Sequence, residues 1–199
     1  MLRLHFAACV VVLLMSAFAG PPAHAQASGP TMTAETKLEG ARLYLQIHQV
    51  LTHPRCLNCH PKGDSPKQGD QRRIHTPPIT RGPYDNGPLG VPCAACHQQA
   101  NYAASGVPGA PSWRLAPISM AWEDKTPGEL CRALSDQRTN GNRDVSAMVA
   151  HLTQNKLIAW GWEPGIGLDG RQREVVPIAK AEFGRIVTAW AKTGAACPE

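Results

Sequence analysis

The chain has 199 residues, of which 18% are charged and 43% hydrophobic, and it contains 18 glycines, 18 prolines and seven cysteines. This length favours one compact domain and allows two small ones at most. The charged fraction is too low, and the apolar fraction too high, for a disordered chain. A net charge of +5 excludes a strongly acidic protein and is too small for a dedicated nucleic-acid binder.

Residues 1–25 have the pattern of a secretory signal peptide. Arg3 gives a positive start, Phe6–Ala19 is apolar, and Ala23–Ala25 supplies the small residues that a signal peptidase reads. The apolar run is shorter than the roughly 20 residues that span a bilayer as a helix. The sequence therefore predicts export, into the periplasm of a Gram-negative cell, of a mature chain that starts at Gln26 and does not span the membrane. An uncleaved anchor is the alternative.

The segment 26–52 contains the first predicted helix. A capping box, Thr36–Glu39, opens it, and it runs over 37–52 because the proline at position 54 disfavours helical geometry just before it. Its expected apolar stripe includes Leu38 and Leu45.

Two C-x-x-C-H units follow, at 56–60 and 93–97. This spacing is the attachment signature of c-type haem. Two thiols three residues apart on a helical turn meet the two vinyl groups of one porphyrin edge, and the next histidine is carried under the iron as its proximal ligand. The residues expected to hold two covalent haems are Cys56, Cys59, His60, Cys93, Cys96 and His97.

Other chemistries of paired cysteines fit this pattern less well. A zinc ribbon places its pairs roughly 15–20 residues apart, whereas 33 residues lie between Cys59 and Cys93. An iron–sulfur cluster needs no histidine after each pair. The neighbouring prolines argue against thioredoxin-like redox pairs. Zinc and disulfides are the alternatives that remain for these four thiols.

The chain around these units is expected to be irregular. Residues 61–92 contain seven prolines and five glycines and show neither a helical nor a strand period. Residues 106–117 are similar. Such long loops are unusual in a compact domain, but they are reasonable if they wrap porphyrins, which supply apolar surface that the loops lack.

Three further helices are predicted in the C-terminal half, over 126–135, 145–154 and 179–193. The first begins at a capping box, and Gly194 closes the last as its C′ residue. Cys131 and Cys197 are left over in an oxidising compartment and are most simply a disulfide. A thiolate ligand to an iron is the alternative.

The predicted fold is therefore mainly α with extensive irregular loops. Two tandem cytochrome domains would each need about 80–100 residues, so both haems are expected to share a single multihaem cytochrome c domain over 26–199. Its parts are the N-terminal helix at 26–52, the haem-attachment loops at 53–120 and the helical C-terminal half at 121–199.

The sixth ligand of each iron decides whether that iron only transfers electrons or also binds small molecules. His75, Met120 and His53 are the candidates, and His151 is a weaker one. A surface histidine, or a thioether packed against indole, is the ordinary alternative for each. The expected assignment is one iron with two histidines and one with histidine and methionine. Because methionine raises the reduction potential relative to histidine, electron flow between the two would be directional.

The excess positive charge of the mature chain lies beside the first haem unit. The segment Arg55–Arg81 has six cations and two carboxylates, a net charge of +4, and the rest is balanced. These cations either pair with haem propionates or form a docking face for an acidic redox partner, with association that weakens as salt rises.

Several stretches outside the haem units are unusual: HPRCLNCHP at 53–61, PSWRLAP at 111–117, MAW at 120–122, IAWGWEPG at 158–165 and GAACP at 194–198. Together they resemble a family of exported bacterial dihaem c-type cytochromes often labelled "isoquinoline 1-oxidoreductase subunit". Isoquinoline oxidoreductases are molybdenum hydroxylases with iron–sulfur centres, and this chain has neither the size nor the cysteines for those groups. The resemblance implies a haem partner that accepts electrons from such a dehydrogenase.

The sequence thus predicts a periplasmic dihaem c-type cytochrome that carries electrons between a donor dehydrogenase and an acceptor cytochrome. It predicts no nucleic-acid partner. The alternative function is a haem enzyme in which one five-coordinate haem acts on peroxide or on a small sulfur or nitrogen compound. A small-ligand haem sensor is a third possibility.

Overall fold

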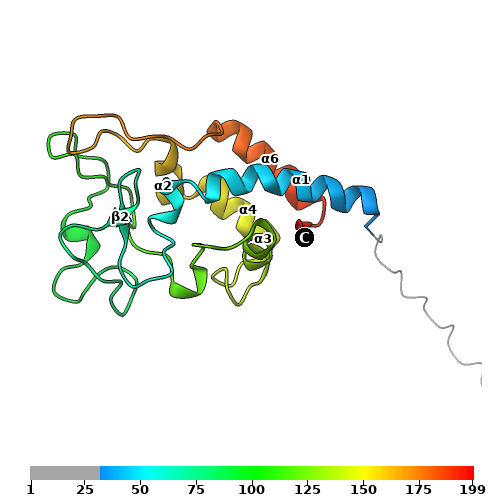
Figure 1. Cartoon of the computed structure of the whole chain (residues 1–199), viewed down its shortest axis with the longest axis horizontal. Coiled ribbons are helices and arrows are strands. Elements are labelled where there is room, and N and C mark those ends of the chain that lie inside the picture. The colour runs from blue at the N-terminus through cyan, green and yellow to red at the C-terminus, as the bar shows by residue number, and fades with distance from the viewer. Residues whose placement is uncertain (1–31) are drawn as a thin grey trace, which may run out of the picture. The chain divides into compact units, whose positions relative to one another are not determined.

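The protein is described by a computed structural model, which covers residues 32–199 (Figure 1). The predicted signal peptide at 1–25 lies outside the described residues. The described chain is mainly helical, as predicted. No helix in this part of the chain is long and apolar enough to cross a membrane. The helices and strands, in chain order, are α1 (Ala34–Leu51), α2 (Pro54–Leu57), β1 (Lys67–Gln68), β2 (Arg73–Ile74), α3 (Pro127–Ser135), α4 (Val145–Gln154), α5 (Lys156–Ala159) and α6 (Lys180–Lys192), with short 3-10 turns at Cys93–Ala95, Ile118–Met120 and Trp160–Trp162.

Helix α1 begins one turn earlier than the capping box predicts. The side chain of Thr33 accepts a hydrogen bond from the amide of Thr36, at 3.1 Å, and is the actual cap. Its buried face holds Tyr44 and Ile47, while Leu38 and Leu45, which were expected on the apolar stripe, are exposed. The predicted end is correct, since the helix stops at Leu51, before the proline.

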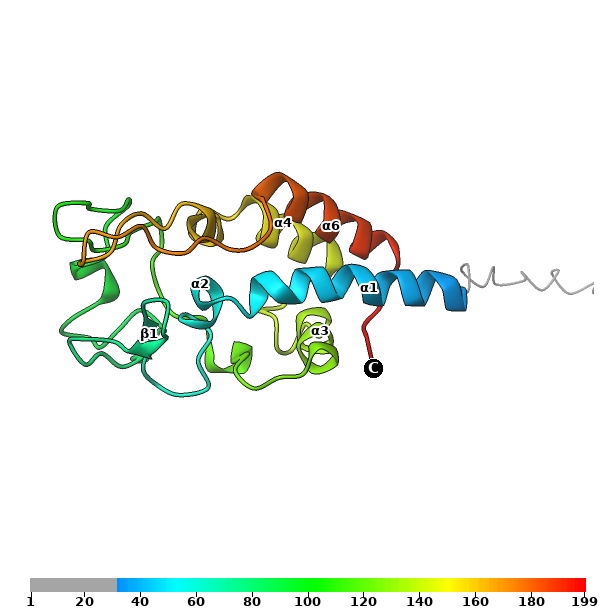
Figure 2. The same cartoon turned by 45° about the horizontal axis from the view of Figure 1, so that its top comes forward.

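Four helices form a hydrophobic core of their own. Helix α1 packs against α3 and α6, and α6 packs against α4 (Figure 2). The core holds Tyr44, Leu130, Met148, Phe183 and Trp190, all buried. The main driving force for this half is therefore ordinary burial of apolar side chains.

Helices α1 and α6 approach each other closely near the end of α6. A Cβ on Gly40 would lie 2.8 Å from the Cβ of Ala196, a spacing that real side chains essentially never adopt. Glycine is thus needed at this position in α1 because the C-terminal segment crosses it.

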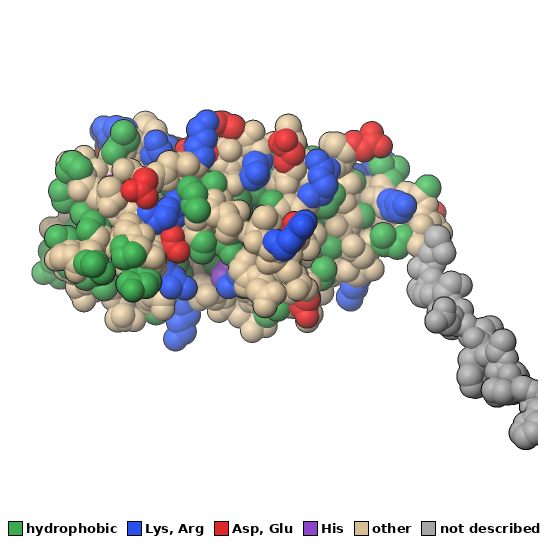
Figure 3. Space-filling view, turned by 90° about the horizontal axis from the view of Figure 1, so that it is seen from below, with side chains coloured by type: hydrophobic (Ala, Val, Ile, Leu, Met, Phe, Trp, Pro, Cys, Tyr) green, Lys and Arg blue, Asp and Glu red, His purple; other side chains and the backbone are tan. Residues whose placement is uncertain are grey.

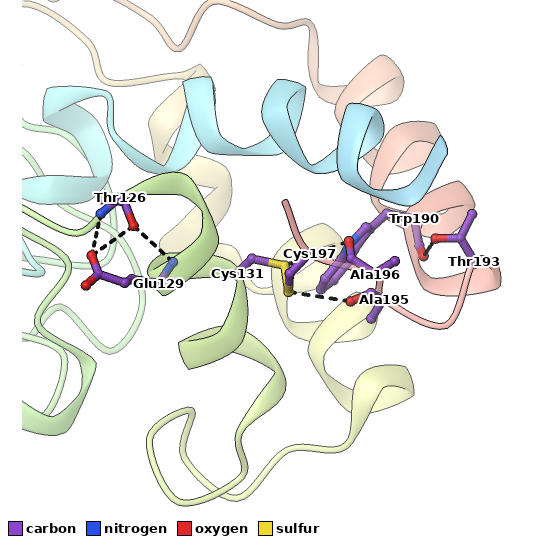
Figure 4. The surroundings of a disulfide bond; sticks show 8 residues. All are labelled: Thr126, Glu129, Cys131, Trp190, Thr193, Ala195, Ala196 and Cys197. Carbon is purple, nitrogen blue, oxygen red and sulfur yellow. Dashed lines mark hydrogen bonds between the residues drawn. A yellow bond between two sulfur atoms is a disulfide. The ribbon is translucent and has the colours of Figure 1, made fainter. Parts of the chain in front are cut away.

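The start of α3 and the C-terminal segment follow the sequence prediction (Figure 4). Thr126 and Glu129 form the capping box, with the carboxylate of Glu129 accepting from the Thr126 amide at 2.8 Å. Cys131 and Cys197 form a disulfide that joins α3 to the segment after α6, with their Cα atoms 5.5 Å apart. Gly194 has a φ of +72°, as its predicted role at the end of α6 requires.

The loops at 58–121 are built differently from the helical half. Apart from prolines, their only buried apolar side chains are Ala110 and Leu115. The space-filling view in Figure 3 shows hydrophobic side chains gathered on the surface of the loop end, at the left of the view. The large exposed apolar side chains of these loops are Ile74, Tyr84, Leu89, Val91, Tyr102 and Ile118.

Backbone hydrogen bonds and one buried cation hold these loops together. The amide of Ala116 donates to the carbonyl of Cys59 at 3.0 Å, so the chain before Trp122 runs beside the first C-x-x-C-H unit. The guanidinium of Arg81 is buried, and it donates to the carbonyls of Ala116 and, at 3.1 Å, of Gly63. Polar bonds therefore fix the loop end, whereas apolar packing fixes the helical end.

Candidate functional site

The first C-x-x-C-H unit is built on the short helix α2. His53 caps this helix, its Nδ1 accepting from the amide of Arg55 at 3.2 Å, and a proline occupies the first turn. The helix carries Cys56, and turn hydrogen bonds continue from it through Cys59 to His60. The two thiols are thus one turn apart with the histidine next to the second, which is the geometry that haem attachment requires.

The imidazole of His60 is oriented by two contacts. Its Nδ1 lies 2.8 Å from the carbonyl oxygen of Met120, and because a carbonyl can only accept, Nδ1 carries the proton and donates it. The ring also stacks on Trp122, with centroids 3.4 Å apart and planes 10° from parallel. Burial lowers the pKa of His60 to about 4, so the ring is neutral with Nε2 left to bind a metal.

The second unit repeats this arrangement on different elements. A 3-10 turn carries Cys93, and the amide of His97 donates to its carbonyl at 2.9 Å. The Nδ1 of His97 donates to the carbonyl of Pro108 at 2.7 Å, and the ring stacks on Trp113 with centroids 4.6 Å apart and planes 10° from parallel. Burial lowers the pKa of His97 as well. Both C-x-x-C-H imidazoles therefore present Nε2 in the same way.

The ring of His75 lies next to the ring of His97. Their ring centroids are 5.9 Å apart with planes at 64°, and the Nδ1 of His75 donates to the carbonyl of Pro77 at 2.9 Å, which leaves its Nε2 available. A metal–imidazole bond is roughly 2.0 Å, and a ring nitrogen lies about 1.2 Å from the centroid. Two imidazoles on opposite sides of one iron would thus have centroids about 6.4 Å apart. The observed spacing of 5.9 Å is about half an ångström shorter than that value.

Met120 and His53 are less favourably placed. The carbonyl oxygen of Met120 lies at the Nδ1 edge of His60, whereas a sixth ligand would lie beyond Nε2. Its terminal methyl group instead approaches Gly141. His53 uses its Nδ1 as a helix cap, and it makes no ring contact with either motif histidine among residues 32–199.

The four motif thiols are unpaired in the structure. Burial raises the pKa of Cys56 to about 12 and that of Cys59 to about 11, and the charge of Cys93 adds to the shift at Cys59. The end of the first motif therefore lies near the start of the second. No group of three or more histidine, cysteine or acidic side chains converges within the described chain as a metal site would.

The cations beside the first unit are largely paired with carboxylates. Two ion pairs use acids of the segment itself: the buried Arg55 pairs with Asp70, and Arg81 lies 3.9 Å from Asp64. Three further ion pairs recruit acids from outside the segment. Adding these three carboxylates lowers the net charge from +4 to +1. Only Lys67 and Arg73 of the six cations form no ion pair within residues 32–199. The recruiting pairs are Lys62–Asp124, Arg72–Glu123 and Arg81–Asp85.

A third tryptophan extends the aromatic contacts between the two units. Trp160 meets Trp113 edge to face at 4.9 Å, and its indole N–H donates to Asn101 at 2.8 Å. The guanidinium of Arg55, next to Cys56, lies 5.6 Å from the centre of the Trp160 ring. The sequence singled out these tryptophan motifs without giving them a role, and it gave no signal for the backbone carbonyls that bind the imidazoles.

Comparison of the chain with protein-family models, with curated proteins and with solved structures finds no match. The resemblance to the dihaem cytochrome family therefore rests on the sequence motifs alone and stays a prediction.

Proposed function

We propose that the protein is an exported dihaem c-type cytochrome that transfers electrons. One observation supports this most directly. The two histidines that end the C-x-x-C-H units each donate Nδ1–H to a backbone carbonyl and stack on an indole. Such outer contacts are typical of metal-binding histidines, because they fix the tautomer and the ring orientation. The thiols at the same two places complete the chemistry of haem attachment.

The residues present suit two haems. Bound haem supplies a one-electron iron couple. Cys56, Cys59 and His60 would hold the first haem, and the equivalent residues of the second unit the other. The exposed apolar side chains of the loops would pack against porphyrin and so be removed from water.

His75 is proposed as the sixth ligand of the second iron. The 5.9 Å spacing from His97 and the free Nε2 of each ring both suit ligation from opposite faces. An iron held in this way has no open position, which favours electron transfer over the enzyme alternative at this haem.

For the first iron, His151 on α4 is proposed as the sixth ligand. It lies one turn from Met148, whose cluster contains Trp122, the tryptophan stacked on His60. Its charge also contributes to lowering the pKa of His60, so the two residues lie in the same part of the molecule. It makes no side-chain hydrogen bond to another described residue. In this proposal, a second histidine pair takes the place of the expected histidine–methionine pair.

The proposed partners are a periplasmic donor dehydrogenase and an acceptor cytochrome. The pairing of most cations in Arg55–Arg81 leaves Lys67 and Arg73, on the β1–β2 hairpin, as the positive charges for an acidic partner. The hairpin that carries these two cations runs directly into His75, the proposed ligand of the second haem.

Expression in a host with and without cytochrome c maturation tests the proposal. The mature protein should weigh the polypeptide plus two haems, show a low-spin spectrum and, when reduced, bind almost no carbon monoxide. The His75→Ala variant should keep both haems and take up one carbon monoxide per protein. A colourless parent protein would overturn the function, and a variant with parental carbon monoxide binding would overturn the role of His75.

A further inference from the structure

We infer that the segment Pro108–Trp122 is a single strap that orients both proximal imidazoles, with Trp113 and Trp122 as positioning residues that set the reduction potentials of the two irons. This inference rests on the proposed function and adds a specific role for the tryptophan motifs.

The strap supplies a hydrogen-bond acceptor and a stacked indole to each of the two rings. The carbonyl of Pro108 and the indole of Trp113 serve His97, at 2.7 Å and 4.6 Å. The carbonyl of Met120 and the indole of Trp122 serve His60, at 2.8 Å and 3.4 Å. The two histidines come from separate motifs, yet their partners lie on 15 consecutive residues. One segment therefore controls both metal-binding nitrogens.

Hydrogen bonds to the loops fix the middle of the strap. The amide of Leu115 donates to the carbonyl of Asp85 at 2.8 Å, and the amide of Ala116 donates to Cys59 at 3.0 Å. Leu115 is one of the few buried apolar side chains of the loop half. Because these bonds fix the backbone, the indoles on either side of them have little freedom to move.

The two tryptophans of the strap are packed to different extents. Trp122 is 8% exposed and belongs to the core of the helical half, together with Met148 and Leu152 of α4. Trp113 is half-buried and is backed by the edge of Trp160 at 4.9 Å. The first imidazole is thus restrained by the main core and the second by a local aromatic pair.

The physical effect follows from the ring geometry. An indole parallel to an imidazole blocks rotation about the Cβ–Cγ bond, and that rotation would break the Nδ1–H···O=C hydrogen bond. This bond makes the imidazole a stronger electron donor, which favours ferric over ferrous iron. Loss of the indole should therefore weaken the bond and raise the reduction potential of the haem concerned.

Three leucine variants of the mature dihaem protein test this inference. Trp113→Leu and Trp122→Leu should each raise the potential and alter the EPR g values of one haem, and a different haem in each variant. Trp162→Leu is the matched control: its indole packs against Phe183 at 5.2 Å and donates to Ile178, and it contacts neither motif histidine. It should lower the melting temperature while leaving both haems with parental potentials.

Conservative variants keep the test decisive if Trp122→Leu does not fold. Trp122→Phe retains an aromatic ring and should therefore show the parental g values. Trp113→Leu changes a residue of the loop half only, so it should fold even if Trp122→Leu does not. Parental potentials and g values in a folded, two-haem Trp113→Leu protein would overturn the inference, and so would equal shifts in Trp162→Leu. The haem content of the parent, measured first, separates this outcome from failure of the proposed function.

Discussion

Removal of the Cys131–Cys197 disulfide should destabilise the helical half and leave the haem sites unchanged. The bond ties α3 to the segment after α6, and both ends lie in the core that α1, α4 and α6 complete. Within residues 32–199, neither cysteine makes a hydrogen bond to a motif histidine or to its tryptophan partner. The appropriate change is the double variant Cys131→Ala/Cys197→Ala, because alanine fills the buried positions without adding a polar group.

The expected magnitude follows from the length of chain that the bond closes. With a sequence separation of 66 residues, the chain-entropy model gives about 15 cal/mol/K, hence about 4 kcal/mol at 25 °C. For a chain of this size, each kcal/mol corresponds to about 2–4 °C in melting temperature. The double variant should therefore melt about 8–16 °C below the oxidised parent.

Circular dichroism at 222 nm, recorded on heating at one protein concentration, would measure this difference. The parent treated with reductant should melt close to the double variant. The absorption spectra at 25 °C, recorded with the haems of all three samples fully reduced, should be the same. A fall in melting temperature of less than about 2 °C would refute the entropy argument, and a changed haem spectrum would refute the separation of the two halves.

Two other substitutions test the packing and the buried charge. Gly40→Ala should lower the free energy of unfolding by about 1–3 kcal/mol because the added methyl group overpacks the α1–α6 crossing. Gly184→Ala in α6, where the methyl group would meet Thr153 at an ordinary 3.8 Å, should raise it by about 0.5–1 kcal/mol. Urea midpoints at an unchanged m-value measure both. Asp70→Asn should lower the free energy of unfolding by about 3 kcal/mol because it leaves Arg55 buried without its anion. Asp124→Asn, which removes an exposed ion pair, should leave the urea midpoint at the parental value.

The sequence predicted those parts of the fold that local signals specify. The capping box at Thr126, the glycine at 194 and the apolar period of α4 gave correct helices, since each signal acts within one or two turns. The start of α1 was wrong because threonines at 33 and 36 can both cap, and only the structure shows that the earlier one does. Leu38 and Leu45 were misplaced because tertiary contacts with α6, rather than periodicity, decide which face is buried.

The candidate site was predictable only where covalent chemistry imposes a spacing. The C-x-x-C-H units can be recognised directly in the sequence. The backbone carbonyls of Pro108 and Met120 cannot, because any residue type supplies a carbonyl. The same holds for the ion pair of Arg72 with Glu123, which joins residues 51 positions apart. Met120 was considered a candidate ligand because of its thioether, whereas the contact seen in the structure is made by its backbone carbonyl, which accepts from His60.

The proposed pairing of histidines at both irons removes methionine as the source of a potential difference, so any difference must come from the surroundings. A ferric haem carries one more positive charge than a ferrous one, and burial disfavours that charge. The first unit borders the helical core through Trp122, whereas in the second unit Cys96 is exposed and Trp113 is only half-buried. The first haem should therefore have the higher potential. Electrons would then enter at the second haem, next to the unpaired cations of the β1–β2 hairpin, and move towards the helical half.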